Sequence, residues 1–204
     1  KYLVKKGYKV FRMGKIVNKN ISFSDNNIID YPYSTIKSDF MDVFIAHRCE
    51  FCISTGVGYD SLPVIFRKPM VYTNIIPIGC LWTWNKYYIA ILKHLRYKNT
   101  NSYLTTSQHF NLDLDRAGKS NIFNENNVEI IENKDIDILN VVKEMIFLIE
   151  NKFNKESLLQ VNSSKFWEKY KKNILYKYNN YDFYGNFISN LSKKFIQNYP
   201  NYLD

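Results

Sequence analysis

The spacing of apolar and polar positions changes along the chain, and residues 51–73 show this most clearly. A short apolar run is followed by two hydroxyl residues and two glycines, and apolar residues then recur at helical spacing before a second apolar run. This order predicts a strand, a glycine turn, a short helix and a second strand. So short a crossover fits only a compact parallel β-α-β unit. The residues at and after the turn that could face a ligand are Ser54, Thr55, Gly56, Gly58, Asp60 and Ser61.

A turn of this kind is suited to binding phosphate. The glycines let a ligand approach the backbone, and backbone N–H groups at the start of a helix favour an anion. A structural interpretation stays open beside this one, in which the glycines only turn the chain. Asp60 also has two interpretations, because it could cap the helix or accept hydrogen bonds from the hydroxyl groups of a ligand.

The rest of the pattern predicts further elements. Strands are expected at 8–12, 28–31, 88–92 and 128–132, and helices at 38–48, 104–110, 135–152, 156–176 and 186–198, with Gly185 at a bend. We therefore expect an α/β fold with an open, mostly parallel, Rossmann-like sheet over 1–152 and a helical extension packed on it over 153–204. Ligands bind such sheets at the carboxyl ends of the strands. Arg12 and Asn74 each end a predicted strand and join the candidates, Arg12 as a diphosphate contact.

Composition narrows the class of protein only a little. The 204 residues carry a formal charge of +9, which permits phosphate-rich partners, acidic membrane surfaces or nucleic acid. Lysines and aromatic residues alternate over 165–178, which favours an amphipathic helix with its lysines in water. Cys49 and Cys52 form a CxxC without a second pair, so two buried small residues are favoured over metal or redox use. No apolar run approaches the length of a membrane span, and we expect a cytoplasmic protein.

The central stretch also resembles a known family. Ser54-Thr55-Gly56, Gly58, Asp60-Ser61, Pro63 and Phe66-Arg67-Lys68-Pro69, with Asn74 beyond, are similar to the signature of a bacterial glycosyltransferase family. They are more distantly similar to the donor-side glycine loop of GT-B enzymes, including sugar-nucleotide 2-epimerases. Looser matches are Gly7–Gly14, Ile29-Asp30-Tyr31 followed by Ser38-Asp39-Phe40, and the closing Asn198–Leu203. The resemblance therefore spans nearly the whole chain.

The resemblance implies the half of a GT-B glycosyltransferase that binds a nucleotide-sugar donor for transfer to a glycan or glycoconjugate acceptor. The donor would contact the six turn residues, Arg12 and Asn74, without a metal or other cofactor. The amino-terminal half, where any catalytic base would lie, is expected to be absent, so no catalytic residue is named. Peripheral contact with the inner membrane face is compatible with this function, and nucleic acid is not expected. Two alternatives stay open: an epimerase of the same fold, and a non-catalytic basic and aromatic module that binds membrane or nucleic acid.

Overall fold

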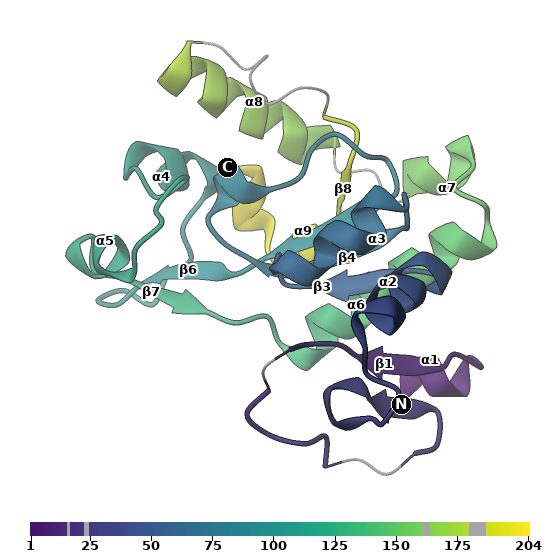
Figure 1. Cartoon of the computed structure of the whole chain (residues 1–204). Helices are drawn as coiled ribbons and strands as arrows, with labels where there is room; N and C mark the ends of the chain where they lie inside the picture. The colour runs from purple at the N-terminus through teal and green to yellow at the C-terminus, as the bar shows by residue number, and fades with distance from the viewer. Residues whose placement is uncertain (16, 23–24, 161–163, 180–186) are drawn as a thin grey trace. The chain divides into compact units, whose positions relative to one another are not determined.

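The computed structural model describes residues 1–15, 17–22, 25–160, 164–179 and 187–204 (Figure 1). The chain divides into two compact units. Lys1–Cys52 and Val57–Lys68 make up the first, which we call the N-terminal unit. Ile53–Gly56 and Pro69–Asp204 make up the second, which we call the sheet unit. The predicted bend at Gly185 lies outside the described residues.

The N-terminal unit is built on two short parallel strands. β1 (Val10–Arg12) pairs with β2 (Ile28–Asp30), so that Arg12 lies opposite Asp30. The helix predicted at 38–48 forms, and Ser38 is its N-cap, because its hydroxyl accepts a hydrogen bond of 3.2 Å from the backbone N–H of Met41. The other elements of this unit are α1 (Tyr2–Lys5), the 3₁₀ turns η1 (Tyr31–Tyr33) and η2 (Gly58–Asp60), α2 (Asp39–Arg48) and α3 (Ser61–Ile65).

The sheet unit contains an open, all-parallel sheet of four strands with flanking helices, which confirms the predicted fold class at that level (Figure 1). The strand order is β3 (Cys52–Ser54), β4 (Met70–Ile75), β5 (Tyr88–Leu92) and β8 (Asn190–Leu191). Every residue of β5, and every residue of β4 except Asn74, is buried. Strands covered on both faces need apolar side chains in succession, which explains the unbroken apolar runs in the sequence.

The strand predicted at 128–132 forms, but in a separate sheet. β7 (Val128–Ile131) pairs antiparallel with β6 (His94–Tyr97), which begins two residues after β5 ends. An apolar cluster separate from the four-stranded sheet lies around this pair of strands and includes Leu95, Leu104, Leu114, Phe123 and Val128. Two short helices connect the two strands: α4 (Thr106–Asn111) and α5 (Ser120–Glu125).

Residues 153–204 contribute a strand as well as helices, so the helix predicted at 186–198 is wrong over its first part. The backbone N–H of Ser192 donates to Ala90 O at 2.9 Å, and the Asn190 amide donates to Lys86 O at 3.2 Å. These bonds hold β8 extended along β5. Among the described residues of this region, the helices are α7 (Lys155–Gln160), α8 (Ser164–Tyr178) and α9 (Lys193–Asn198), followed by the 3₁₀ turn η5 (Pro200–Leu203).

Two long helices bury one face each. α6 (Asp135–Glu150) packs against β4 and β5 through residues that include Val141 and Met145. α8 buries Phe166, Trp167 and Tyr170 and leaves lysines exposed, as expected for an amphipathic helix. No helix in the described part of the chain is both long enough and apolar enough to cross a membrane.

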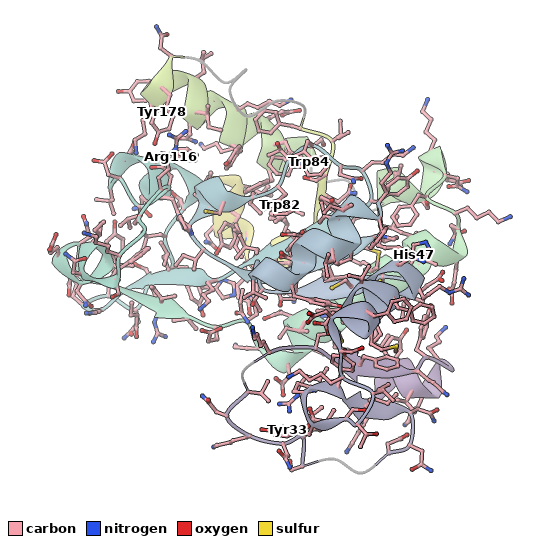
Figure 2. All side chains as sticks on the ribbon, viewed as in Figure 1. Tyr33, His47, Trp82, Trp84, Arg116 and Tyr178 are labelled. Carbon is pink, nitrogen blue, oxygen red and sulfur yellow. The ribbon has the colours of Figure 1, made fainter. Side chains whose placement is uncertain are left out.

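A buried ionic cluster attaches the end of α8 to the loop after α4. The fully buried carboxylate of Asp115 accepts hydrogen bonds from Lys177 Nζ and from the Tyr178 hydroxyl. The guanidinium of Arg116 lies over the Tyr178 ring, with Cζ 4.4 Å from its centroid (Figure 2). Lys177 Nζ also donates to Phe110 O at 2.9 Å, so the lysine charge is surrounded by oxygen atoms.

Tryptophans from the segment before β5 pack on the sheet strands. The Trp82 ring centroid lies 5.1 Å from that of Tyr72 and 5.9 Å from that of Tyr88. Trp84 stacks on Trp82 at 5.9 Å but leaves 51% of its surface exposed (Figure 2). Trp82 is therefore mainly a packing residue, whereas Trp84 presents a ring to solvent.

Two histidines are buried in an aromatic cluster formed with residues of α9 and η5. Phe195, Tyr199 and Tyr202 surround His94, and the Tyr199 ring centroid is 4.0 Å from that of His94. His109 is packed beside Tyr202, and within the described residues neither of its ring nitrogens has a hydrogen-bond partner. Burial lowers the pKa of His94 to about 4 and that of His109 to about 3. Both imidazoles are therefore neutral in the folded protein near neutral pH.

We predict that this cluster makes the protein less stable in mild acid. When the pH falls from about 7.5 to about 5.5, each histidine binds a proton in the unfolded state but stays neutral in the folded state. Each of the two histidines therefore lowers the free energy of unfolding by about 1.4 kcal/mol over this interval. Urea unfolding of wild type and His109→Leu at both pH values measures this. The variant should lose about 1.4 kcal/mol less over the interval than wild type, whatever its stability at the higher pH. His47→Gln, at an exposed position, is the matched control, and an equal loss in His109→Leu would contradict the account.

Candidate functional site

The predicted turn is present at the carboxyl end of β3. Ser54 is buried, and its Oγ accepts a hydrogen bond of 3.1 Å from the backbone N–H of Gly56. The Thr73 hydroxyl on β4 donates to Ser54 O at 3.4 Å. Thr55 and Gly56 are exposed. The turn thus presents a hydroxyl group and a residue without a side chain at the end of a parallel strand.

Gly56 is required by its backbone conformation. Its φ of +79° lies in the left-handed region, which residues with a side chain adopt only at a cost in free energy. A Cβ at this position would lie 3.6 Å from Ile75 Cδ1, which is an ordinary contact. Any substitution at Gly56 is therefore strained even in the absence of a ligand.

Asn74 lies at the end of the neighbouring strand, where β4 bulges. Its φ is +56°, and the pairing register with β5 shifts between Tyr72 and Ile75. The Asn74 backbone N–H donates to Asn133 Oδ1 at 2.6 Å, and Asn74 Oδ1 accepts from the Asn133 backbone N–H at 2.7 Å. The side-chain oxygen of Asn74 is thus already engaged within the protein.

Asn133 is a residue of this edge that the sequence prediction missed. It is 7% exposed, and its Nδ2 donates to Leu92 O at 2.6 Å. With its two bonds to Asn74, it connects the carboxyl ends of β4 and β5 to the segment that leads into α6. The only signal in the sequence was an asparagine directly after a predicted strand.

Arg12, in the N-terminal unit, is part of an ion pair. Its Nε donates to Asp30 Oδ1 at 2.7 Å, and its Nη1 donates to Lys19 O at 2.7 Å. Asp30 Oδ2 accepts from the backbone N–H of Ile21 at 2.8 Å. Burial acts to raise the pKa of Asp30, but the bonds from Ile21 and Arg12 outweigh it and keep that pKa below its usual value. In the structure the Arg12 guanidinium serves to hold the loop after β1.

The other predicted residues after the turn, Gly58, Asp60 and Ser61, also belong to the N-terminal unit. Asp60 is buried and occupies the N-cap position of α3, but its side chain makes no capping hydrogen bond. The capping interpretation of the Asp60 side chain is therefore wrong. Ser61 begins a helix of only five residues, which offers few aligned peptide dipoles. Gly58 is exposed, and a Cβ there would meet no atom within 4 Å.

The predicted site residues thus fall into two groups. Ser54, Thr55, Gly56 and Asn74 lie in the sheet unit, at the carboxyl ends of adjacent strands. Gly58, Asp60 and Ser61 follow one another along the N-terminal unit, and Arg12 lies on β1 of the same unit.

The CxxC cysteines are poorly suited to thiolate chemistry. Burial, followed by the neighbouring Cys49 and Asp60, raises the pKa of Cys52 to about 12. Burial also raises the pKa of Cys49, whose Sγ donates to Ala46 O at 3.2 Å. Both thiols are therefore protonated at neutral pH, when neither acts as a nucleophile.

Comparisons of the chain with protein-family models, with curated proteins and with solved structures found no match.

We predict that Asn133 is a major contributor to the stability of the sheet edge. Asn133→Ala leaves the Asn74 N–H and the buried carbonyl of Leu92 without their partners, at about 1–3 kcal/mol for each buried group. Urea unfolding should show a loss of about 2–6 kcal/mol. Asn121→Ala is the matched control, because the Asn121 side chain is exposed and its amide donates to Glu125 on its own helix. Equal losses in the two variants would contradict the role of Asn133.

Proposed function

We propose that this chain binds the nucleotide-sugar donor of a GT-B-type glycosyltransferase. The observation that carries the proposal is the exposed Thr55–Gly56 turn at the carboxyl end of β3 in an open parallel sheet, with Asn74 at the end of the adjacent strand. Ligands of open α/β sheets bind outside the carboxyl ends of the strands. The resemblance of this stretch to glycosyltransferases adds the class of ligand.

The chemistry of the turn suits a diphosphate. The exposed Thr55 hydroxyl can donate to a phosphate oxygen, and the absence of a side chain at Gly56 lets that oxygen approach the backbone. Such donors would stabilise the negative charge that grows on a departing nucleoside diphosphate. The acceptor, a glycan or glycoconjugate of the cell surface, and any catalytic base would be supplied with the other half of the enzyme.

One observation weighs against the alternative of a basic and aromatic binding module. That alternative needs the aromatic residues of 165–178 at the surface, whereas Phe166, Trp167 and Tyr170 are buried in the sheet unit and Tyr176 alone of the five is largely exposed. An epimerase would share the fold and the turn. It would convert a nucleotide sugar to its epimer or release free nucleoside diphosphate without any acceptor, and product analysis by NMR would identify it.

The test is ligand-observed NMR of the chain with UDP, GDP, CMP and ADP and with their common sugar conjugates. This method detects binding at about millimolar strength, which is what we expect of part of a site. Gly58→Ala is the informative variant. The new methyl group meets no atom within 4 Å, so the fold should be kept, but it is added two residues after Gly56 in the stretch that we propose to contact the donor. We expect one nucleotide to bind wild type and to bind the variant at least about tenfold more weakly.

Gly118→Ala is the matched control for this experiment. Gly118 is also exposed, and a Cβ there also meets no atom within 4 Å, but it lies far along the chain from the turn. Equal binding by Gly58→Ala and wild type would place the nucleotide elsewhere. No binding by a folded sample to any member of the panel would contradict donor binding by this chain. Gly56→Val is unsuitable, because valine would be strained at this left-handed position. A loss of binding could then not be separated from a loss of stability.

A further inference from the structure

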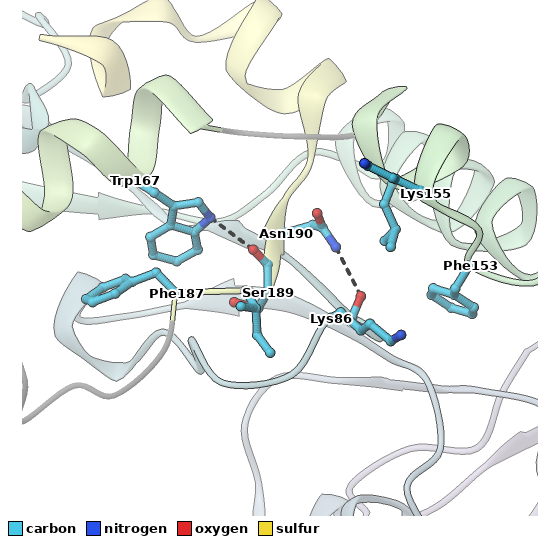
Figure 3. Close-up of a pocket in the computed structure, with 9 residues that line it drawn as sticks. Lys86, Phe153, Lys155, Trp167, Phe187, Ser189 and Asn190 are labelled. Carbon is cyan, nitrogen blue, oxygen red and sulfur yellow. Dashed lines mark hydrogen bonds between the residues drawn. The ribbon is translucent and has the colours of Figure 1, made fainter.

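A pocket of about 470 Å³ lies beside β8, at the opposite edge of the four-stranded sheet from β3 and the turn. Figure 3 shows this pocket in close-up. Its lining includes Lys86, two residues before β5, Ser189, directly before β8, and Asn190 at the start of β8. These are the amino ends of parallel strands, whereas the turn is at a carboxyl end. The volume is in the range of small-molecule binding sites.

The walls of the pocket are aromatic. Trp167 and Phe187 lie on one side, with ring centroids 5.6 Å apart, and Phe153 lies on the other (Figure 3). The Trp167 Nε1–H donates to Ser189 O at 2.9 Å, which fixes the orientation of the indole. The Phe153 ring packs edge-on against Tyr87 at 4.8 Å.

Phe153 reaches this position through an uncommon backbone. Lys152 and Phe153 have φ values of +51° and +50°, two successive left-handed residues without a glycine. For a residue with a side chain, this conformation is less stable than the right-handed one. The surrounding packing therefore holds an aromatic wall where the local backbone would not place it.

The polar groups on the pocket floor are already used. Ser189 Oγ donates to Trp82 O at 2.6 Å, and Asn190 Nδ2 donates to Lys86 O at 3.2 Å. Lys86 and Lys155 supply the positive charge of the lining, and within the described residues neither forms an ion pair. The Lys86 ammonium lies 5.2 Å from the centroid of the Tyr87 ring. The pocket thus combines apolar walls with two exposed cations and few free hydrogen-bonding groups.

We propose that this pocket binds an amphiphilic anion, with a single phosphate or carboxylate head group at Lys86 and Lys155 and an aliphatic body between the aromatic walls. The chemistry is that of an acyl or isoprenyl phosphate or a fatty acid, either free or drawn from a membrane. A nucleotide fits less well, because the pocket floor offers few free hydrogen-bonding groups that could recognise a nucleotide base. The proposal does not depend on donor binding at the turn.

The test uses dodecyl phosphate below its micelle concentration and the indole N–H signals of ¹⁵N-labelled protein. The Trp167 signal should shift on titration, because its indole lines the pocket, while that of Trp84, which does not line it, serves as the internal control. The double variant Lys86→Met and Lys155→Met keeps the aliphatic stems and removes both charges. We expect its affinity to fall by about tenfold, as for two partly exposed ion pairs. Lys172→Met, at an exposed position on α8, is the matched control and should bind as wild type.

A second variant keeps both lysines. Leu158→Trp fills the pocket from α7, and it should abolish the Trp167 shift while thermal unfolding remains cooperative. Equal binding of dodecyltrimethylammonium, or unchanged affinity in the double lysine variant, would overturn the proposal. Co-sedimentation with phosphatidylglycerol vesicles, compared with phosphatidylcholine vesicles, distinguishes the sources: selective sedimentation identifies a membrane lipid, and dodecyl phosphate binding without it identifies a free amphiphile.

Discussion

The burial of β5 and of nearly all of β4 is the constraint on which the sheet unit depends. Each fully buried aliphatic or aromatic side chain of these strands contributes about 1.5–3 kcal/mol, so the two strands supply much of the stability of the core. α6 packs against both strands. Because the strand interiors are covered, only their ends are accessible, and chemistry is confined to the loops there. The glycine turn lies at one edge of the sheet, and the pocket beside Lys86 lies at the other.

Elements with strong local signals could be predicted from the sequence. The β-α-β order around Gly56, the Ser38 cap and the hydroxyl-capped helix that begins after Thr105 each depend on residues a few positions apart. The open parallel sheet followed from the alternation of such elements. The local sequence pattern could not predict which strands pair with one another. β8 is two residues long, and only β5 makes it a strand.

The same limit applies to the candidate site. The turn residues are contiguous and could be named from their types, whereas Asn133 reaches Asn74 only after the sheet has formed. Side-chain geometry also decided the role of Asp60, whose position at the start of a helix suggested a cap that its side chain does not form. The pocket unites residues 86, 153 and 190, and no spacing rule connects them.

Several predicted ligand contacts already have internal partners. Ser54 holds the Gly56 N–H, Asn74 is bound to Asn133, and Arg12 is bound to Asp30. Such bonds fix the geometry of a site before a ligand arrives, which lowers the entropy cost of binding. They also use part of the available hydrogen-bonding capacity. A guanidinium has five N–H donors, so Arg12 can keep Asp30 and still contact an anion.

The late position of β8 has a consequence for biosynthesis. Asn190 and Tyr88, which meet where β8 joins β5, are 102 positions apart. At about 5–20 residues per second, the ribosome needs roughly 5–20 seconds to pass from one to the other. During that interval the outer edge of β5 has no strand to pair with, and an open apolar edge can recruit other chains. We expect the nascent chain to need a chaperone, or a temporary partner segment, until Asn190 and Leu191 emerge.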